Sequence, residues 1–247
     1  VVTGLALMRW LSGLENRKWS YRLLIGPETI GSICWLSNNL GKIHNIIGGI
    51  FLEMTGLNQR PALQRSYLGD SFVDQVFEES FRDFDQTGWV ANYRGIVGND
   101  ERQFNGPGFR IPMLSYSRAH PWGHPHRPFK EYHSANDDLS ITSESALKDS
   151  FEHLKFMFDA LEAEKSPVGR YKGEAFLSGL GLALDRNQHL DVMRNRMKIL
   201  DMLDGSNTLS QISRSLQLPI QPVREFVQLL EEAGALESEN ASELTKN

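Results

Sequence analysis

Two glutamates and one histidine stand in sequence surroundings that suggest chemistry. Glu28 closes the apolar run of residues 21–27, and Glu53 interrupts the apolar run of residues 46–54. His133 lies in a polar segment too hydrophilic for a core, with Asp137 four residues later. A carboxylate at the end of a buried strand is costly unless it is paired or bound to a metal. Together the three side chains predict a metal site of the zinc-hydrolase kind, in which bound Zn²⁺ activates a water molecule.

Each of these residues also has a purely structural explanation. Glu28 follows Gly-Pro and precedes a predicted helix, so a favourable interaction with the helix dipole explains it as well as a site does. His133 could be a loop histidine that hydrogen-bonds Asp137. Glu53 is harder to explain without a site, because nothing in its apolar run pairs with it.

Two other features are better explained by structure than by chemistry. The segment that contains His120, His124 and His126 also carries three prolines between residues 121 and 128, which favours a solvated rim loop over a set of metal ligands. Cys34 lies between Ile33 and Trp35 on a predicted helix and is expected to be an inert core residue.

Strands and helices are predicted to alternate along the first two thirds of the chain, where they would position these residues. Helices are expected over residues 2–14, 29–40, 71–84 and 143–164, the last with Ser143 as its N-cap. Buried strands are expected over residues 19–26, 46–54, 89–97 and 111–116. This alternation predicts an α/β fold with helices on both faces of a sheet. Glu28, Glu53 and His133 are expected to meet at the carboxyl edge of that sheet.

The pattern changes near Ser166-Pro167. A glycine-containing linker is expected over residues 167–189, a winged-helix-like domain of three helices over 190–238, and a frayed tail over 239–247. From residue 190 onward there are six Lys and Arg against nine Asp and Glu, a net charge of −3. Because DNA binding requires neutralisation of phosphates, no nucleic-acid partner is expected.

Composition limits the remaining classes. The chain has 247 residues, 40% of them hydrophobic and 23% charged, with a formal net charge of −5. These values fit a globular protein that does not bind nucleic acids in general. One cysteine excludes an internal disulfide and suggests a reducing compartment, so a cytoplasmic location is expected. No apolar run is long enough to span a bilayer, and no membrane association is expected. The absence of an initial Met suggests a piece of a longer protein.

Four segments, in this order, carry a resemblance to a known family. They are residues 21–36 (YRLLIGPETIGSICWL), 100–104 (DERQF), 107–112 (PGFRIP) and 131–139 (EYHSANDDL). The chain resembles a bacterial aminopeptidase-like family with a C-terminal winged helix, associated with surface-polysaccharide biosynthesis. That family is similar to the zinc aminopeptidases, which have a three-layer, phosphorylase/hydrolase-like mixed sheet. The resemblance implies this fold for residues 1–166, as an N-terminally incomplete domain.

The resemblance also implies roles for individual residues. Glu28 matches the general base, with Thr29 where the family's wider clan has a second Glu as a ligand, and Glu28 as a ligand is the alternative. Glu53 and His133 match metal ligands. Asp100 matches an Asp near the pocket for the substrate amine, and Asp137 is the expected hydrogen-bond acceptor for His133. Two further ligands, a His and a bridging Asp, are expected upstream of Val1.

Two functions follow from the resemblance and from the missing ligands. The first is a zinc-dependent aminopeptidase-like hydrolase that cleaves an amide in a small peptide, an aminoacyl compound or an amino-sugar substrate. The second is a catalytically incomplete binding or assembly protein linked to polysaccharide biosynthesis. The sequence is compatible with an oligomer and does not identify the substrate.

Overall fold

The chain folds into two compact units in a computed structural model. The model describes residues 1–96, 98–185 and 189–237. The first unit comprises Val1–Glu162 and the second Ala163–Asn247, and each is described by itself. No helix in the described ranges is long and apolar enough to cross a membrane.

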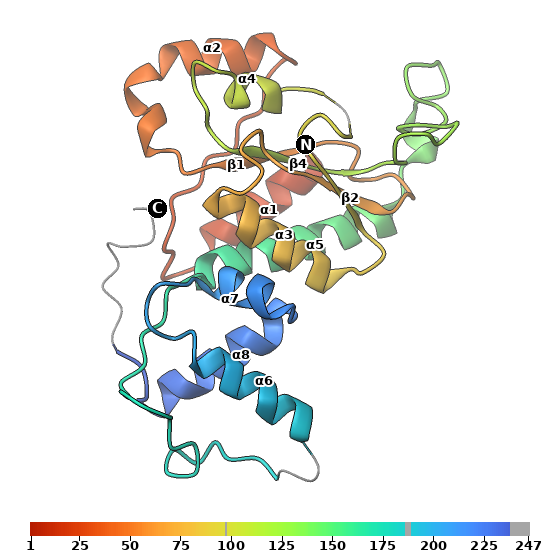
Figure 1. Ribbon diagram of the computed structural model, residues 1–247. Helices are drawn as coiled ribbons and strands as arrows, with labels where there is room; N and C mark the ends of the chain where they lie inside the picture. The colour runs from red at the N-terminus through yellow and green to blue at the C-terminus, as the bar shows by residue number, and fades with distance from the viewer. Residues whose placement is uncertain (97, 186–188, 238–247) are drawn as a thin grey trace. The chain divides into compact units, whose positions relative to one another are not determined.

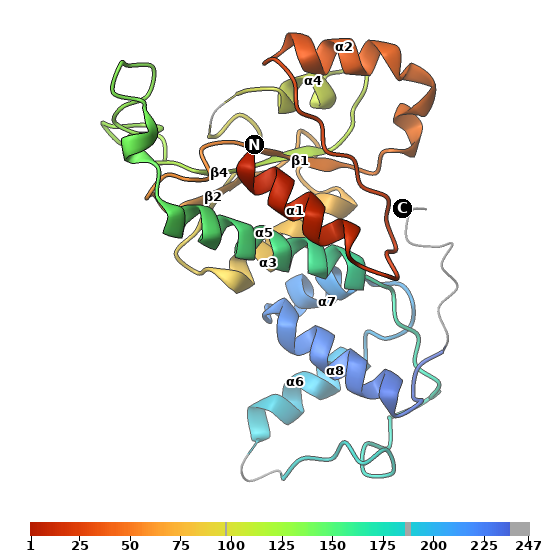
Figure 2. The same cartoon turned by 180° about the vertical axis from the view of Figure 1, so that it is seen from behind.

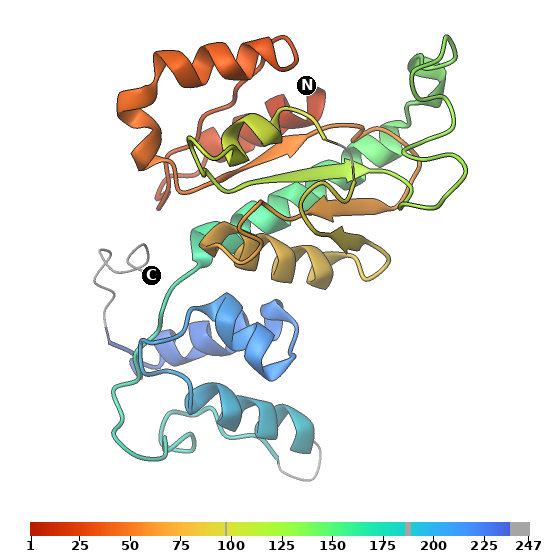
Figure 3. The same ribbon diagram turned by 45° about the horizontal axis from the view of Figure 1, so that its top comes forward.

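A four-stranded mixed sheet forms the centre of the first unit. Its strand order is β1-β4-β2-β3, with β1 at Gly49–Leu52, β2 at Pro61–Gln64, β3 at Trp89–Ala91 and β4 at Met113–Arg118. β4 is parallel to β1 and antiparallel to β2, and β2 is parallel to β3. Figure 3 shows β1 and β4 running in the same direction, towards the loop that follows β4. The carboxyl ends of these two strands therefore share one end of the sheet.

Helices lie on both faces of this sheet. On one face are α1 (Val2–Ser12), α3 (Phe72–Phe84) and α5 (Glu144–Ala163), while α2 (Ile30–Asn38) and the short α4 (Glu101–Asn105) lie over the other (Figure 1 and Figure 2). Two 3-10 turns complete the unit, η1 at Leu40–Asn45 and η2 at Leu139–Ile141. Ser71 caps α3 through a capping box with Asp74, which satisfies N–H groups at the start of the helix. The unit is thus a mixed α/β fold.

The two faces of β4 differ in polarity, and this difference defines the site. Leu114 and Tyr116 are fully buried and pack into the main core with residues of α1, α3 and α5. The alternate residues, Ser115 and Ser117, are also fully buried but face away from that core. Apolar packing under α2 and α4 comes instead from a smaller cluster around Leu36, Phe104 and Ile111. Small polar side chains on one sheet face leave room for other polar groups above them.

Several predicted elements differ from the structure. Residues 19–26 are extended but form no strand, so that prediction is wrong. The backbone N–H groups of Lys18 and Trp19 donate to the Glu162 carboxylate instead of to a strand. The strand expected over residues 89–97 is shorter at Trp89–Ala91, with residue 97 outside the described ranges. The sequence did not predict β2 or α4. The expected helices at 2–14, 29–40, 71–84 and 143–164 are confirmed with small shifts in their ends.

The second unit is built from three helices around its own core. They are α6 (Leu190–Leu200), α7 (Leu209–Leu216) and α8 (Ile220–Glu232), close to the three predicted helices. Ala175 and partly buried side chains from the expected linker pack against this core. Isolated bridges join Val168 to Asp204 and Gly169 to Leu236. The winged-helix assignment stays a prediction, and the expected tail, residues 239–247, lies outside the described residues.

Candidate carboxylate site at the end of the first strand

Glu53 follows the last residue of β1 and is held at the carboxyl end of the sheet. Its backbone N–H donates to the carbonyl of Tyr116 at 3.2 Å, which continues the ladder with β4. Its Oε2 accepts a hydrogen bond from the Asn99 side-chain amide at 3.3 Å, whereas its buried Oε1 has no hydrogen-bond partner. Although Glu53 as a whole is half-buried, one of the two oxygens that share the carboxylate charge is removed from water.

Burial raises the pKa of Glu53 to about 7, and the nearby Glu101 and Glu28 carboxylates add to this rise. The Asn99 amide and the Ser115 hydroxyl oppose it by favouring the charged form. The Ser115 hydroxyl acts without a regular hydrogen bond, because Ser115 Oγ has no partner that meets hydrogen-bond geometry. A strand-end glutamate with this pKa is suited to a metal ligand or to proton transfer near neutral pH.

Polar atoms without partners gather beside Glu53. Among the described residues, the buried side-chain atoms with no hydrogen bond include Asn99 Oδ1, Ser115 Oγ and Ser117 Oγ. Both serines lie on the sheet face turned away from the main core, and Ser115 pairs in register with Phe51, two residues before Glu53. Buried oxygens without donors are rare in folded proteins, so their occurrence together indicates a place for a ligand, an ion or water.

The loop before α4 supplies the other side of the site. The Asn99 backbone N–H donates to Glu101 Oε2 at 2.8 Å, and Glu101 Oε1 accepts from Gln64 on β2 at 3.3 Å. Burial raises the pKa of Glu101. Glu101 therefore fixes Asn99 against the sheet, and Asn99 in turn orients the Glu53 carboxylate.

Asp100 bonds the chain directly after Glu28, at the start of α2. The Thr29 N–H donates to Asp100 Oδ1 at 2.7 Å, so the expected amine-pocket residue ties down the residue after Glu28. Glu28 is exposed and close enough to Glu53 to raise its pKa. Thr29 has a left-handed φ of 64°, and it makes no side-chain cap for α2. The exposed Glu28 carboxylate is free for proton transfer or for a metal.

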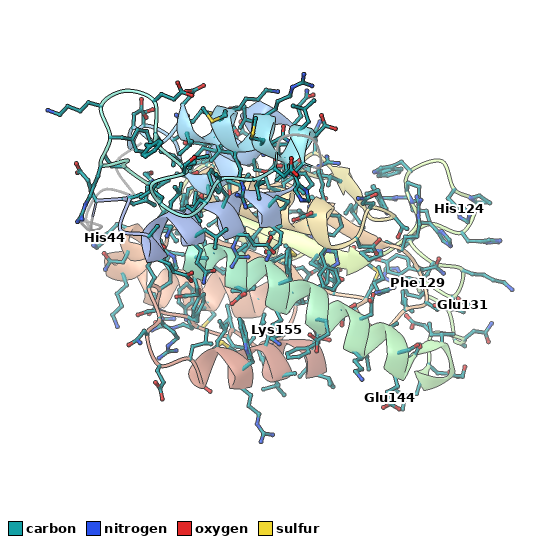
Figure 4. All side chains as sticks on the ribbon, turned by 90° about the horizontal axis from the view of Figure 1, so that it is seen from below. His44, His124, Phe129, Glu131, Glu144 and Lys155 are labelled. Carbon is teal, nitrogen blue, oxygen red and sulfur yellow. The ribbon has the colours of Figure 1, made fainter. Side chains whose placement is uncertain are left out.

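The predicted histidine lies in the loop after β4. Figure 4 shows His124, Phe129 and Glu131 gathered in this loop at the Glu144 end of α5. The exposed His133 stacks on Tyr132 with ring centroids 3.8 Å apart. Burial raises the pKa of Tyr132, with the carboxylates of Glu53 and Glu28 adding to the rise. Tyr132, the neighbour of His133 in the chain, is thus within electrostatic range of both carboxylates.

The structure does not assemble all the predicted groups into one coordination sphere. Across residues 1–96, 98–185 and 189–237, no group of three or more His, Cys, Asp or Glu side chains is arranged to hold a metal ion. In the same ranges, His133 forms no hydrogen bond with Asp137, whose backbone N–H donates to the carbonyl of Ser134. The residues present fit part of a metal site, since Glu53 Oε1 is a buried, unpaired carboxylate oxygen of the type that divalent ions bind.

The remaining histidines and the cysteine stand apart from the carboxylates. His120 and His124 stack at 3.7 Å, and the Arg127 guanidinium covers Trp122 at 3.1 Å, so the loop is packed by its own side chains. Cys34 is exposed, and the expectation of a core cysteine is wrong. It is on the outer side of α2, whose inner side buries Leu36.

Residues that the sequence did not single out complete the site: Gln64, Asn99, Glu101, Ser115 and Ser117. One signal was available, because the alternation Leu114-Ser115-Tyr116-Ser117 marks a strand with one apolar and one polar face.

Comparison with known proteins places the chain in a family. The model described as "Domain of unknown function (DUF4910)" matches residues 1–164. The chain belongs to this family. A relative from Clostridium acetobutylicum, named "Putative polysaccharide biosynthesis protein with aminopeptidase-like domain", is 33% identical over 219 residues, which are 86% of this chain and 49% of the relative. The resemblance inferred from the four sequence segments is thereby confirmed.

A solved structure supports the fold of this DUF4910 member. It is a putative peptidase, also from Clostridium acetobutylicum, and it matches with a TM-score of 0.80 at 27% identity. The match covers 96% of this chain and 53% of the solved one. The chain thus spans about half the length of both proteins.

Proposed function

We propose that this chain supplies part of the active site of a zinc-dependent, aminopeptidase-like hydrolase, which cleaves an amide bond in a small peptide, aminoacyl or amino-sugar substrate. The observation that carries the proposal is the Glu53 carboxylate, buried at the end of β1 with one oxygen unpaired and its pKa raised to about 7. The names of the two relatives support an aminopeptidase-like protein linked to polysaccharide biosynthesis. We also propose that the first unit has the three-layer sheet of the zinc peptidases and that the second is a winged helix.

Glu53 and His133 would hold the metal. Glu53 Oε1 is the available ligand atom, while Asn99 holds Oε2. A bound zinc ion would acidify its water and polarise the scissile carbonyl. The Asn99 contact and the tether from Glu101 would limit the motion of Glu53, as hydrogen-bonded neighbours of metal ligands do.

Glu28 would take the proton from the attacking water and deliver it to the leaving amine. Its exposed side chain allows it to reach water, and its electrostatic effect on Glu53 supports a role beside the proposed metal ligand. Asp100 uses Oδ1 to hold the Thr29 N–H, which leaves Oδ2 for a substrate amine.

A second function is favoured by one observation. In the described part of the chain, no three ligand-type side chains converge on one point. A catalytic zinc needs about three protein ligands and an open position. A binding or assembly protein that keeps the aminopeptidase-like fold without turnover would need no such convergence.

Metal content and hydrolysis distinguish these functions. We expect the 247-residue chain to bind zinc weakly and to show no appreciable hydrolysis of aminoacyl amides. The full-length product of its gene, with the ligands expected upstream, should bind zinc tightly and turn over. Glu53→Ala or His133→Ala should lower its zinc affinity by about 100-fold or more, because the remaining ligands cannot complete the site.

His126→Ala is the matched control, an exposed histidine of the same loop, and should leave zinc content unchanged. Turnover by the 247-residue chain alone, or zinc content that survives both substitutions, would contradict the assignment. A full-length product that binds no zinc and hydrolyses no amide would favour the binding or assembly protein.

A further inference from the structure

A cavity lined by arginines and tyrosines lies next to the carboxylate site. It has a volume of about 800 Å³, and its wall includes Arg94, Arg102 and Arg110 together with Tyr67 and Tyr93. The segment Gly106-Pro107-Gly108 forms another part of the wall. A Cβ added at Gly108 would meet nothing within 4 Å, so the chain is not crowded at this part of the wall.

The three guanidinium groups are not neutralised by carboxylates. Among the described residues, none of Arg94, Arg102 and Arg110 takes part in a salt bridge. Arg102 Nε donates to the carbonyl of Asn99 at 2.9 Å and Arg110 donates to the carbonyl of Asn105 at 3.2 Å. Both bonds go to neutral acceptors, so the positive charges stay available to a ligand.

Two of these arginines make cation–π contacts with tyrosine rings of the cavity wall. The Arg110 guanidinium lies over the Tyr67 ring at 3.8 Å, and that of Arg94 lies 5.5 Å from the Tyr93 centroid. The two rings meet edge to face at 5.7 Å. Stacking restrains a guanidinium without using its N–H donors, which leaves them free to bind an oxyanion.

Backbone strain is concentrated around this cavity. Six non-glycine residues in the described ranges have a left-handed φ, and three of them, Thr29, Arg94 and Arg110, line the cavity. A left-handed φ is costly for such residues, most of all for the β-branched Thr29. Strain of this kind persists where function requires a particular placement of side chains.

We infer that this cavity binds a small ligand, or the end of a chain, that carries a carboxylate or phosphate group. Three guanidinium groups with free donors match such an oxyanion, because a guanidinium can bind two of its oxygens at once. The nearest carboxylates, Asp100 and the fully buried Glu101, accept hydrogen bonds from the Thr29 and Asn99 N–H groups and form no ion pair with the three guanidinium groups within the described ranges, so three positive groups stand against two negative ones. The surplus of positive charge is local, since the whole chain carries a net charge of −5.

The cavity and the carboxylate site share one loop. Arg102 donates a hydrogen bond to the Asn99 carbonyl, and the Asn99 side-chain amide donates one to the Glu53 carboxylate. A ligand anchored by its anionic group would therefore place its remaining part towards the carboxylates. The inference concerns binding alone and holds whether or not the carboxylate site is catalytic.

Calorimetric titration of this chain with a matched set of sugars tests the inference. Glucose, glucuronate and glucose 1-phosphate share one ring and differ mainly in the anionic group. At low ionic strength, at least one of the two anions should bind at least about tenfold more tightly than glucose, since hydrogen bonds to charged groups contribute that much or more. The tighter of the two identifies carboxylate or phosphate as the group recognised.

Arg94→Gln and Arg110→Gln should each weaken this binding by about fivefold or more, and added salt should weaken it in the unsubstituted chain. Arg9→Gln is the matched control, because Arg9 is exposed on α1, over the other face of the sheet. Equal binding of glucose and both anions, no saturation by either anion up to about 10 mM, or affinities unchanged in both cavity variants would overturn the inference.

Discussion

Two glutamates, Glu53 in the first unit and Glu164 in the second, have oxygens removed from water but differ in their hydrogen bonds. In the second unit, Glu164 is fully buried, but both its oxygens are used: Oε1 accepts from the Ser210 N–H at 2.9 Å and Oε2 from the Ser210 hydroxyl at 2.8 Å. In the first unit, Glu53 keeps one buried oxygen without a partner. Burial raises the pKa of both carboxyl groups, but only at Glu53 do neighbouring carboxylates add to the rise.

The contrast distinguishes a carboxylate with a structural role from the one that we propose to be functional. Glu164 satisfies donors in the first turn of α7, where helix N–H groups lack partners, so its environment is complete. Glu53 stands among other unpaired oxygens and next to two carboxylates, so its environment is complete only when something binds. Burial alone does not mark a site, whereas burial without partners does.

The largest loss of stability in acid should come from a third buried group, His153, whose hydrogen bond and stacking partners favour its neutral form. Its Nε2–H donates to the carbonyl of Phe81 at 3.1 Å, and it stacks between Phe81 and Phe84 at 4.6 Å from each. Burial lowers its pKa to about 4. The unfolded chain binds a proton near pH 6.5 and the folded chain only near 4, so stability is lost as pH falls through this window, by about 3 kcal/mol in total.

Urea unfolding of the first unit at pH 7 and pH 5 measures this effect. On going from pH 7 to pH 5, Glu53 of the same unit gains stability because its pKa is raised, which offsets the His153 loss in the unsubstituted chain. We therefore expect His153→Phe to change in stability between the two pH values by about 2 kcal/mol more favourably than the unsubstituted chain, whatever that variant does to stability at pH 7. His126→Gln should change as the unsubstituted chain does. If His153→Phe and the unsubstituted chain showed the same change between pH 7 and pH 5, His153 would not be the source of the acid sensitivity.

A loss of stability of nearly the same size should follow from Glu164→Ala. The change leaves the Ser210 N–H and hydroxyl buried without an acceptor, which should lower the free energy of unfolding of the second unit by about 2–3 kcal/mol. Amide exchange in α7 and α8 reports this unit separately. Glu237→Ala, at an exposed position of the same unit, is the control. Unchanged exchange protection would show that Glu164 is not the structural member of the pair.

How far the sequence predicts these features depends on the range of the interactions involved. The helices were predictable because periodicity and caps are local, as in the capping boxes of Ser71 and Thr208. Segment 19–26 resembles a strand in sequence because it is short, apolar and ended by Gly-Pro. In the structure its first residue, Trp19, donates its N–H to Glu162, more than a hundred residues away, a contact that no local pattern predicts.

The residues of the candidate site also differ in how far local sequence predicts them. Glu53 was predictable since a carboxylate in an apolar run conflicts with its local environment. Asn99, Ser115 and Ser117 carry no such conflict, because polar residues are ordinary in loops and serines are tolerated in strands. The arginine cavity was beyond local reasoning, since Arg94, Arg102 and Arg110 come from loops and a short helix that only the folded chain brings together.

The smallest effect, and the most specific test of the contrast between the two glutamates, should come from Glu53→Gln. The amide has the same shape but carries no charge, so it removes the cost of burying a carboxylate beside Glu28 and Glu101. Because Oε1 has no partner to lose, we expect the free energy of unfolding of the first unit at pH 8 to stay unchanged or to rise by about 1 kcal/mol. The equivalent change Glu164→Gln should lower the stability of the second unit, since an amide nitrogen cannot accept the bonds of Ser210. Urea unfolding of both variants measures whether each substitution raises or lowers the free energy of unfolding. A loss of stability for Glu53→Gln as large as that for Glu164→Gln would mean that Glu53 is held by structural partners after all, and that its open oxygen does not mark a binding site.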